Sequence, residues 1–138
     1  MEPRLVEDLM SENPFTLNQG STLAEAWDMM ETSHVRHVPI LDQDGALVGL
    51  LTERDVLRAV GPALENLPLQ ARNELLADTP VEDVMVHDPE TVMPDDDLVS
   101  AAQTLLDNKY GCLPVVGREM GLTGILTESD FVRYFASR

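Results

Sequence analysis

Apolar residues along the first half of the chain follow two spacings, one typical of helices and one typical of strands. The stretch 22–30 places its apolar residues three and four positions apart, which is the spacing of one face of a helix. Two β-prone runs follow at 34–41 and 46–52, on either side of a turn rich in Asp and Gly at 42–45. Helical spacing returns at 53–60. The pattern predicts a helix, a hairpin and a second helix.

The second half of the chain repeats this succession. Helical spacing runs over 97–105, strands are predicted at 109–116 and 122–127 on either side of a turn at 118–121, and 128–135 is again helical. A segment ahead of each first helix, NPFTL in one half and DPETV in the other, predicts a turn that leads into a short strand. Each half therefore predicts a β-α-β-β-α unit.

An internal repeat accounts for this agreement. When the chain is shifted by 75 positions, residues 6–63 align with 81–138 without a gap, and 16 of the 58 aligned positions are identical. The phrase GLLTERDVLR at 49–58 matches GILTESDFVR at 124–133 in six of ten positions. Duplication is the simplest explanation, and two small copies can bury their apolar faces on each other.

The repeat sets the expected division of the chain. We expect a first unit over 1–63, a connector over 64–80 that forms a short helix between prolines, and a second unit over 81–138. In each unit the last helix should turn its apolar side chains to one face. These side chains are Val56, Leu57 and Val60 in the first copy and Phe131, Val132 and Phe135 in the second.

Four short motifs carry a resemblance to a known family. Each copy opens with V-E-D-[LV]-M, continues with P-x-T, has an apolar residue before a proline in the first hairpin strand, and ends with G-x-L-T-E-x-D. In this order, twice and at identical spacing, they resemble a tandem pair of CBS domains, named after cystathionine β-synthase and called a Bateman module. The resemblance covers essentially the whole chain. It implies an α/β (α+β) fold in which two pseudo-symmetric β-α-β-β-α repeats pack sheet to sheet.

The resemblance also implies a function. CBS pairs have a cleft with two potential sites for adenosine-containing ligands, commonly form homodimers, and usually regulate an attached or partner protein rather than catalyse. On this basis no cofactor is required, and an adenine nucleotide (AMP, ADP or ATP) is the expected regulatory ligand.

The repeated G-x-L-T-E-x-D phrase has a purely structural explanation. Thr52 with Asp55, and Thr127 with Asp130, have the spacing of a capping box, in which each partner bonds the backbone N–H of the other. Such a cap stabilises a helix by about 1 kcal/mol. The glycine that opens each phrase would let a neighbouring element approach the strand closely.

The same residues also suit a nucleotide. A helix N-terminus directly after a strand presents free N–H groups and a partial positive charge, which favour a phosphate, and a Thr hydroxyl adds a hydrogen bond. A carboxylate one turn later can accept both hydroxyls of a ribose. The sequence thus places the ribose on Asp55 or Asp130, and the phosphate near Thr52 or Thr127.

The resemblance further assigns residues around the base. Apolar side chains and backbone N–H and C=O groups of four short segments would contact the adenine. These segments are Pro14, Phe15 and Thr16, then His37, Val38 and Pro39 in the first copy, and Pro89, Glu90 and Thr91, then Cys112, Leu113 and Pro114 in the second.

The net charge of the chain restricts the classes of molecule that it can bind. It has 25 acidic residues against 9 basic ones, which gives a net charge of -16. This charge repels nucleic acids and anionic membranes, so we expect neither as a partner. Local donors must then hold a phosphate, and the candidates are His34, Arg36 and Arg54 in the first copy and Lys109 in the second. The two sites are therefore predicted to be unequal, unless the two arginines merely pair with nearby acids.

Two further features of the sequence bear on the cellular compartment of the protein. No apolar run reaches the roughly 18 residues that a membrane span requires. The N-terminus, MEPRLVEDLM, is acidic and lacks the layout of a signal peptide. We expect a cytoplasmic protein.

Neither catalysis nor a metal site is expected. No Ser or Cys stands in a recognisable nucleophile motif, and Cys112, the only cysteine, is interpreted as a small buried hydrophobe. His34 and His37 are expected in one strand with their side chains on opposite faces, so they are poorly placed to chelate one metal. The three aspartates at 95–97 are interpreted as a helix start rather than as a cation site.

Two functions from different classes remain open at this point. The first is a regulatory module that binds an adenine nucleotide and modulates a partner protein that the sequence does not identify. The second is a purely structural dimerisation or interaction module with an empty cleft. S-adenosylmethionine or NAD would also fit a carboxylate that binds a diol. Stabilisation by an added ligand separates the alternatives.

Overall fold

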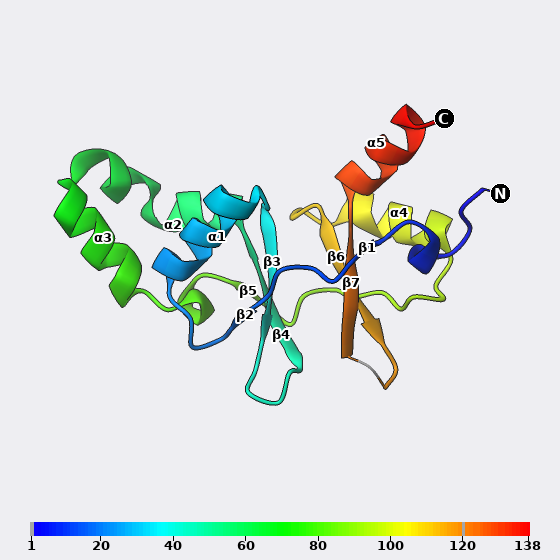
Figure 1. The fold of residues 1–138 in the computed structure, drawn as a ribbon, viewed down its shortest axis with the longest axis horizontal. Coiled ribbons are helices and arrows are strands. Elements are labelled where there is room, and N and C mark those ends of the chain that lie inside the picture. The colour runs from blue at the N-terminus through cyan, green and yellow to red at the C-terminus, as the bar shows by residue number, and fades with distance from the viewer. Residues whose placement is uncertain (1, 120) are drawn as a thin grey trace. The chain divides into compact units, whose positions relative to one another are not determined.

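The computed structural model describes residues 2–119 and 121–138, which form a mixed α/β fold with two sheets and five α-helices (Figure 1). The chain divides into two compact units. Unit 2 comprises Phe15–Asp88, and unit 1 comprises Pro89–Arg138 together with the N-terminal segment up to Pro14. The predicted fold class is confirmed, but the compact units do not coincide with the sequence repeats.

Unit 2 contains a four-stranded sheet in the order β2-β3-β4-β5. β3 (His37–Leu41) and β4 (Leu47–Thr52) form an antiparallel hairpin, β2 (Leu17–Asn18) runs parallel to β3, and β5 (Val86–His87) runs antiparallel to β4. The carboxylate of Asp42 accepts two backbone N–H groups within the hairpin turn. These bonds explain why the predicted turn is rich in Asp and Gly.

Three α-helices belong to unit 2. α1 (Leu23–Ser33) begins after Thr22, whose hydroxyl accepts the N–H of Glu25. α2 (Glu53–Asn66) follows β4 directly, and α3 (Leu69–Asp78) occupies most of the expected connector. α3 packs against both α1 and α2 (Figure 1). The first copy therefore has a third helix over its two repeat helices.

Unit 1 contains a three-stranded sheet in the order β1-β7-β6. β6 (Cys112–Gly117) and β7 (Gly121–Thr127) form an antiparallel hairpin, and β1 (Ser11–Glu12) pairs antiparallel with β7. The predicted turn at 118–121 includes Met120, which lies outside the described residues.

Two α-helices accompany this sheet. α4 (Leu98–Asp107) begins after Asp97, whose carboxylate accepts the N–H of Ser100 at 2.9 Å. α5 (Glu128–Ala136) follows β7 directly, as α2 follows β4. Within the part of unit 1 that the structure describes, no third α-helix accompanies them.

The V-E-D-x-M motif of each repeat packs on the hairpin of the other repeat. It forms a 3-10 helix in both copies, at Val6–Asp8 and Val81–Asp83, and leads into β1 or β5. In β1, Glu12 lies opposite Gly124, and in β5, His87 lies opposite Gly49. The two registers are equivalent under the 75-residue shift. The two units thus have the same strand pairing and have exchanged their N-terminal segments.

This exchange explains the glycine and the methionine in the repeated motifs. A Cβ at Gly49 would overlap the side chain of Met85. A Cβ at Gly124 would lie 2.9 Å from Sδ of Met10 and 2.7 Å from the carbonyl oxygen of Ser11. A glycine at each position leaves room for the methionine of the neighbouring segment. The prediction that these glycines admit a close neighbour is confirmed.

Each unit has its own hydrophobic core. The core of unit 2 combines buried residues of α1, β3, β4 and α2 with Leu76 of α3 and Val81 of the 3-10 helix. The core of unit 1 combines buried residues of α4, β6 and β7 with Val6 of the exchanged segment. The N-terminal segment is therefore a part of the unit 1 core, which the repeat alignment did not indicate.

Two local predictions were wrong. His34 does not lie in a strand: it ends α1 with φ 55°, in the left-handed conformation that commonly terminates helices, and β3 begins only at His37. α2 continues past the expected end at residue 60 and reaches Asn66. The apolar face of the last helix is only partly buried in both units, because Leu57 is 43% exposed and Val132 is 66% exposed.

Candidate functional site

The candidate residues of the first copy meet at one end of the unit 2 sheet. His37 at the start of β3 pairs with Thr52 at the end of β4. One residue earlier, the carbonyl of Arg36 accepts the N–H of Glu53, the first residue of α2, at 2.9 Å. Thr16 lies directly before β2, which runs beside β3. The start of β3, the end of β4 and the N-terminus of α2 therefore lie together.

Thr52 and Asp55 form the predicted capping box at the start of α2. Oγ1 of Thr52 accepts the N–H of Asp55 at 3.1 Å, and Oδ2 of Asp55 accepts the N–H of Thr52 at 3.3 Å. Among the described residues, no group donates to the other oxygen, Oδ1, and Asp55 takes part in no ion pair. Asp55 is partly buried. One of its oxygens is thus an acceptor that the protein itself does not use.

The counterpart in unit 1, Asp130, is buried, with 3% of its side chain exposed, and has donors on both oxygens. Oδ2 accepts the N–H of Thr127 at 2.9 Å and its hydroxyl at 3.5 Å. Oδ1 accepts the hydroxyl of Ser11 at 2.7 Å and the guanidinium of Arg133 at 2.6 Å. Arg133 also donates to Oγ of Ser11 at 3.4 Å. The Asp130 carboxylate therefore joins β1 to α5.

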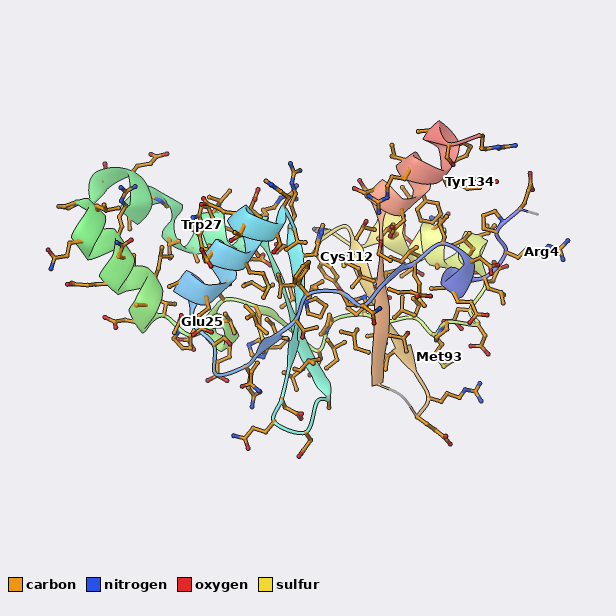
Figure 2. All side chains as sticks on the ribbon, in the orientation of Figure 1. Arg4, Glu25, Trp27, Met93, Cys112 and Tyr134 are labelled. Atoms are coloured by element: carbon orange, nitrogen blue, oxygen red, sulfur yellow. The ribbon has the colours of Figure 1, made fainter. Side chains whose placement is uncertain are left out.

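Cys112, labelled in Figure 2, is fully buried and lies opposite Thr127 in the β6–β7 pair. Burial, together with the negative charge of Asp130, raises the pKa of its thiol to about 12. The thiol is therefore protonated at neutral pH and a poor nucleophile. This confirms the interpretation of Cys112 as a small buried hydrophobe.

The segments predicted to line a base are divided between the two units. Residues 15–16 belong to unit 2 with the segment 37–39, whereas Pro14 belongs to unit 1 with 89–91 and 112–114. Among the candidates, Phe15 presents an aromatic side chain that is 51% exposed. Pro89 is buried outside the strands, and the other buried candidates lie within strands β3 and β6: Val38, Pro39, Cys112, Leu113 and Pro114.

In unit 1 the backbone of the 89–91 segment is already hydrogen-bonded to a side chain. The N–H of Glu90 donates to the hydroxyl of Tyr110 at 3.0 Å. The aligned positions of the first copy are Phe15 and Val35, and valine has no hydroxyl to accept this N–H. Among the described residues, none accepts the N–H of Phe15.

The cationic candidates are available for an anion. An open hollow of about 470 Å³ in unit 2 is lined by Met30, Glu31, His34, Val35, Arg36 and Glu53. The residues of the capping box do not line this hollow. Arg54 and Lys109 are exposed. In the described part of the chain none of the four cationic candidates forms an ion pair, so the alternative that the two arginines merely pair with acids is not supported.

The acidic residues before α4 act within the chain. Asp97 caps α4, and Asp96 accepts the N–H of Met93 at 2.8 Å. Within residues 2–119 and 121–138, no cluster of three or more His, Cys, Asp or Glu side chains could hold a metal ion. The helices described there are all too short or too polar to cross a membrane.

Three residues of unit 1 were missed from the sequence: Ser11, Tyr110 and Arg133. The alignment of the copies does contain a signal for two of them. Ser11 aligns with Val86, and Tyr110 aligns with Val35, so at both positions unit 1 has a hydroxyl where unit 2 has valine. Arg133 carries no such signal, because both copies have arginine at that position.

Comparison with known proteins identifies the family. A family model of the CBS domain matches the chain twice, over residues 6–62 and 81–137, and the chain therefore belongs to the CBS domain family. An uncharacterized protein of Methanocaldococcus jannaschii is 33% identical over 96% of this chain and 43% of its own length. Homoserine O-acetyltransferase of Methanohalophilus mahii is 34% identical over 88% of this chain and 22% of that enzyme. The chain thus spans less than half the length of these relatives.

Solved structures similar to this chain include ligand complexes. The AcuB protein of Vibrio cholerae is 38% identical, with a TM-score of 0.77 over 96% of this chain and 90% of that one. CBSX2 in complex with AMP is 26% identical, with a TM-score of 0.79 and 98% of both chains covered. The CBS domain pair of protein MJ0100, with 5′-methylthioadenosine and S-adenosyl-L-methionine, gives the same identity, coverage and TM-score. Two of these similar proteins thus hold adenosine-containing ligands.

Proposed function

We propose that this chain is a non-catalytic regulatory module that binds an adenine nucleotide and modulates a partner protein. The observation that carries the proposal is the capping box of α2, where no described residue donates to one of the two carboxylate oxygens of Asp55. The complexes of two similar CBS pairs with adenosine-containing ligands support it. The protein would act in the cytoplasm, where adenine nucleotides are made.

In this proposal the ribose lies on Asp55. Its carboxylate accepts the 2′- and 3′-hydroxyls, because two neighbouring O–H donors match the two oxygens. The hydroxyl of Thr52 and the free N–H groups in the first turn of α2 supply donors for the phosphate. Phe15, half exposed in the same unit, supplies an apolar surface for the base.

Arg36 and Arg54 supply the charge that a phosphate chain requires. In a chain of net charge -16, long-range electrostatics oppose an anionic ligand, so local bidentate donors must offset this repulsion. The second copy has Gly111 and Ser129 at the aligned positions. Arg36→Ala and Arg54→Ala should each weaken binding of ATP more than binding of adenosine. Wild-type affinity for ATP in both variants would remove the arginines from the site.

S-adenosylmethionine is a second candidate, because the similar MJ0100 pair is bound to it. This ligand has the same ribose diol but a cationic sulfonium in place of phosphates. The negative charge of the chain attracts such a ligand at long range. Arg36→Ala should then leave binding of S-adenosylmethionine unchanged or stronger, whereas it weakens binding of ATP.

The proposal includes a homodimer formed through α4 and α5. These helices expose four large apolar side chains, each at least 66% exposed: Val99, Leu106, Val132 and Phe135. In unit 2 the equivalent helices α1 and α2 are in contact with α3. A second copy presents the same apolar face, so a two-fold contact would bury both faces. Light scattering at high protein concentration and moderate salt should give the mass of a dimer, and a monomer would overturn this part.

A thermal-shift panel tests the proposed function. ATP, ADP, AMP, S-adenosylmethionine and NAD are added at constant ionic strength, and the unfolding temperature is followed against ligand concentration. A ligand that binds the native state stabilises it by about 2.7 kcal/mol at one hundred times its dissociation constant. We expect at least one adenine nucleotide to stabilise the protein saturably. If none of the five does so, the purely structural module is the better explanation.

A further inference from the structure

The two aspartates of the repeated phrase differ in the donors that they meet. In unit 1, Ser11 of the exchanged segment donates to Oδ1 of Asp130 at 2.7 Å, and Arg133 donates to the same oxygen at 2.6 Å. Asp130 is 4% exposed, so water does not compete freely for these bonds. The oxygen that would face a ligand hydroxyl is therefore already occupied by two protein donors.

In unit 2 the same positions lack this cluster. In unit 2, Val86 stands where unit 1 has Ser11, at the equivalent register of the strand pairing: Val86 lies opposite Leu50, and Ser11 lies opposite Ile125. Arg58 is the counterpart of Arg133 in unit 2, yet among the described residues Arg58 forms no ion pair. The two units therefore differ in the serine hydroxyl, which is present only where both carboxylate oxygens of the aspartate have protein donors.

A second difference of the same kind lies at the same end of the unit 1 sheet. The hydroxyl of Tyr110, two residues before β6, accepts the N–H of Glu90 at 3.0 Å. The first copy has Val35 at this position. A backbone donor that could bind a base edge is thus occupied in unit 1, whereas no described residue accepts the N–H of Phe15.

We infer that Ser11, Arg133 and Tyr110 close the second copy to a nucleoside, so that the chain binds the ribose through Asp55 alone. The inference rests on the proposed function and adds the number of ligands and the residues that set it. To bind at Asp130, the ribose hydroxyls must displace Ser11 and Arg133. A hydrogen bond to a charged group changes an equilibrium by roughly ten- to hundredfold. Arg133 is 65% exposed, so its hydrogen bond to Asp130 contributes a factor at the low end of this range.

Exchange of the differing residues between the copies tests the inference. In the variant Ser11→Val with Tyr110→Val, unit 1 acquires the residues of unit 2. In the matched reverse variant Val86→Ser, unit 2 acquires the serine hydroxyl of unit 1. Calorimetric titration with AMP gives the stoichiometry and the dissociation constant of each protein, and circular dichroism shows that each variant is folded.

We expect the wild-type chain to bind one AMP, and the Ser11→Val/Tyr110→Val variant to bind a second AMP with a dissociation constant within about tenfold of the first. Val86→Ser should weaken the wild-type site by about tenfold. Two sites of equal affinity in the wild-type chain, or one site in the folded double variant, would overturn this inference and leave the proposed function standing. No binding of AMP by any of the proteins would overturn the proposed function as well.

Discussion

Unit 1 and unit 2 build the same capping box and differ in what surrounds it. Asp55 caps α2 and keeps a free acceptor, whereas Asp130 bonds Ser11 and Arg133 and joins β1 to α5. The duplicated phrase therefore keeps its structural role in both copies. In our proposal, the capacity of each unit to bind a ligand depends on residues outside the phrase, contributed by a segment that lies far away along the chain.

The largest difference between the units should appear when each aspartate is removed. Asp130→Ala leaves the partly buried hydroxyl of Ser11 without its acceptor and also removes the helix cap, so it should lower the free energy of unfolding by about 3 kcal/mol. Asp55→Ala removes only a helix cap and should cost about 1 kcal/mol. Urea unfolding followed by circular dichroism measures both losses. Equal losses would show that the contacts of Asp130 add nothing to its cap.

The two glycines offer a second comparison. Gly124→Ala should destabilise by about 2–3 kcal/mol, because its Cβ would meet the backbone carbonyl of Ser11, which cannot move without breaking the β1–β7 pair. Gly49→Ala meets the side chain of Met85, which can change its rotamer, and should cost about 1 kcal/mol. The matched variant Gly49→Ala/Met85→Ala tests whether the methionine is the obstacle. If Gly49→Ala proved the costlier change, this distinction between backbone and side chain would be wrong.

Alkaline pH should weaken the protein through Cys112, whose counterpart in unit 2 is His37. The folded thiol has a pKa of about 12 against an ordinary value of 9.0, so the unfolded chain loses this proton first as the pH rises. The contribution of the protonated thiol to the free energy of unfolding is therefore fully present below pH 9. Between pH 9 and about 12 this free energy falls by roughly 1 kcal/mol for each pH unit. Unfolding of wild type and Cys112→Ala at pH 8 and pH 10 isolates this contribution. The same pH dependence in both proteins would contradict it.

The smallest expected effect concerns the helix faces. Val132→Ser with Phe135→Ser should shift the dimer towards monomer. Leu57→Ser changes the counterpart of Val132 in unit 2 and should leave the dimer intact, because α3 packs on α1 and α2 in that unit. The proposed dimer would carry -32, twice -16, so added salt should strengthen it by screening this charge. Light scattering at two salt concentrations measures both effects. A dimer that dissociates with Leu57→Ser instead would place the interface on unit 2.

Much of the fold could be predicted from the sequence, because hydrophobic spacing and turn residues act locally. The helices at 23–33 and 98–107 begin next to the predicted caps, and both hairpins were expected. β1 and β5 were missed because strands of two residues have no alternating pattern to detect. The full length of α2 was also missed, because Gly61 and Pro62 interrupt the helical signal without ending the helix.

The exchange of N-terminal segments could not be predicted in principle from the repeat. Both copies have a methionine that fits a glycine, so the motif of either copy matches the hairpin of either copy equally well. For the same reason the hydrogen bond between Ser11 and Asp130, which lie 119 positions apart, could not be predicted. The alignment of the copies does show that Ser11 differs from Val86 at the corresponding position. The candidate capping boxes were correct because they depend on a spacing of three residues within one turn.

The most direct test of the account compares AMP with 2′-deoxy-AMP on the wild-type protein and on Asp55→Asn. We expect the wild-type chain to bind AMP roughly ten- to hundredfold more tightly than the deoxy ligand, because the deoxy ligand lacks one hydrogen bond to the charged carboxylate. In Asp55→Asn both ligands should bind weakly and with nearly equal affinity. Equal affinities in the wild type, or a preference that survives in Asp55→Asn, would contradict the claim that Asp55 holds the ribose.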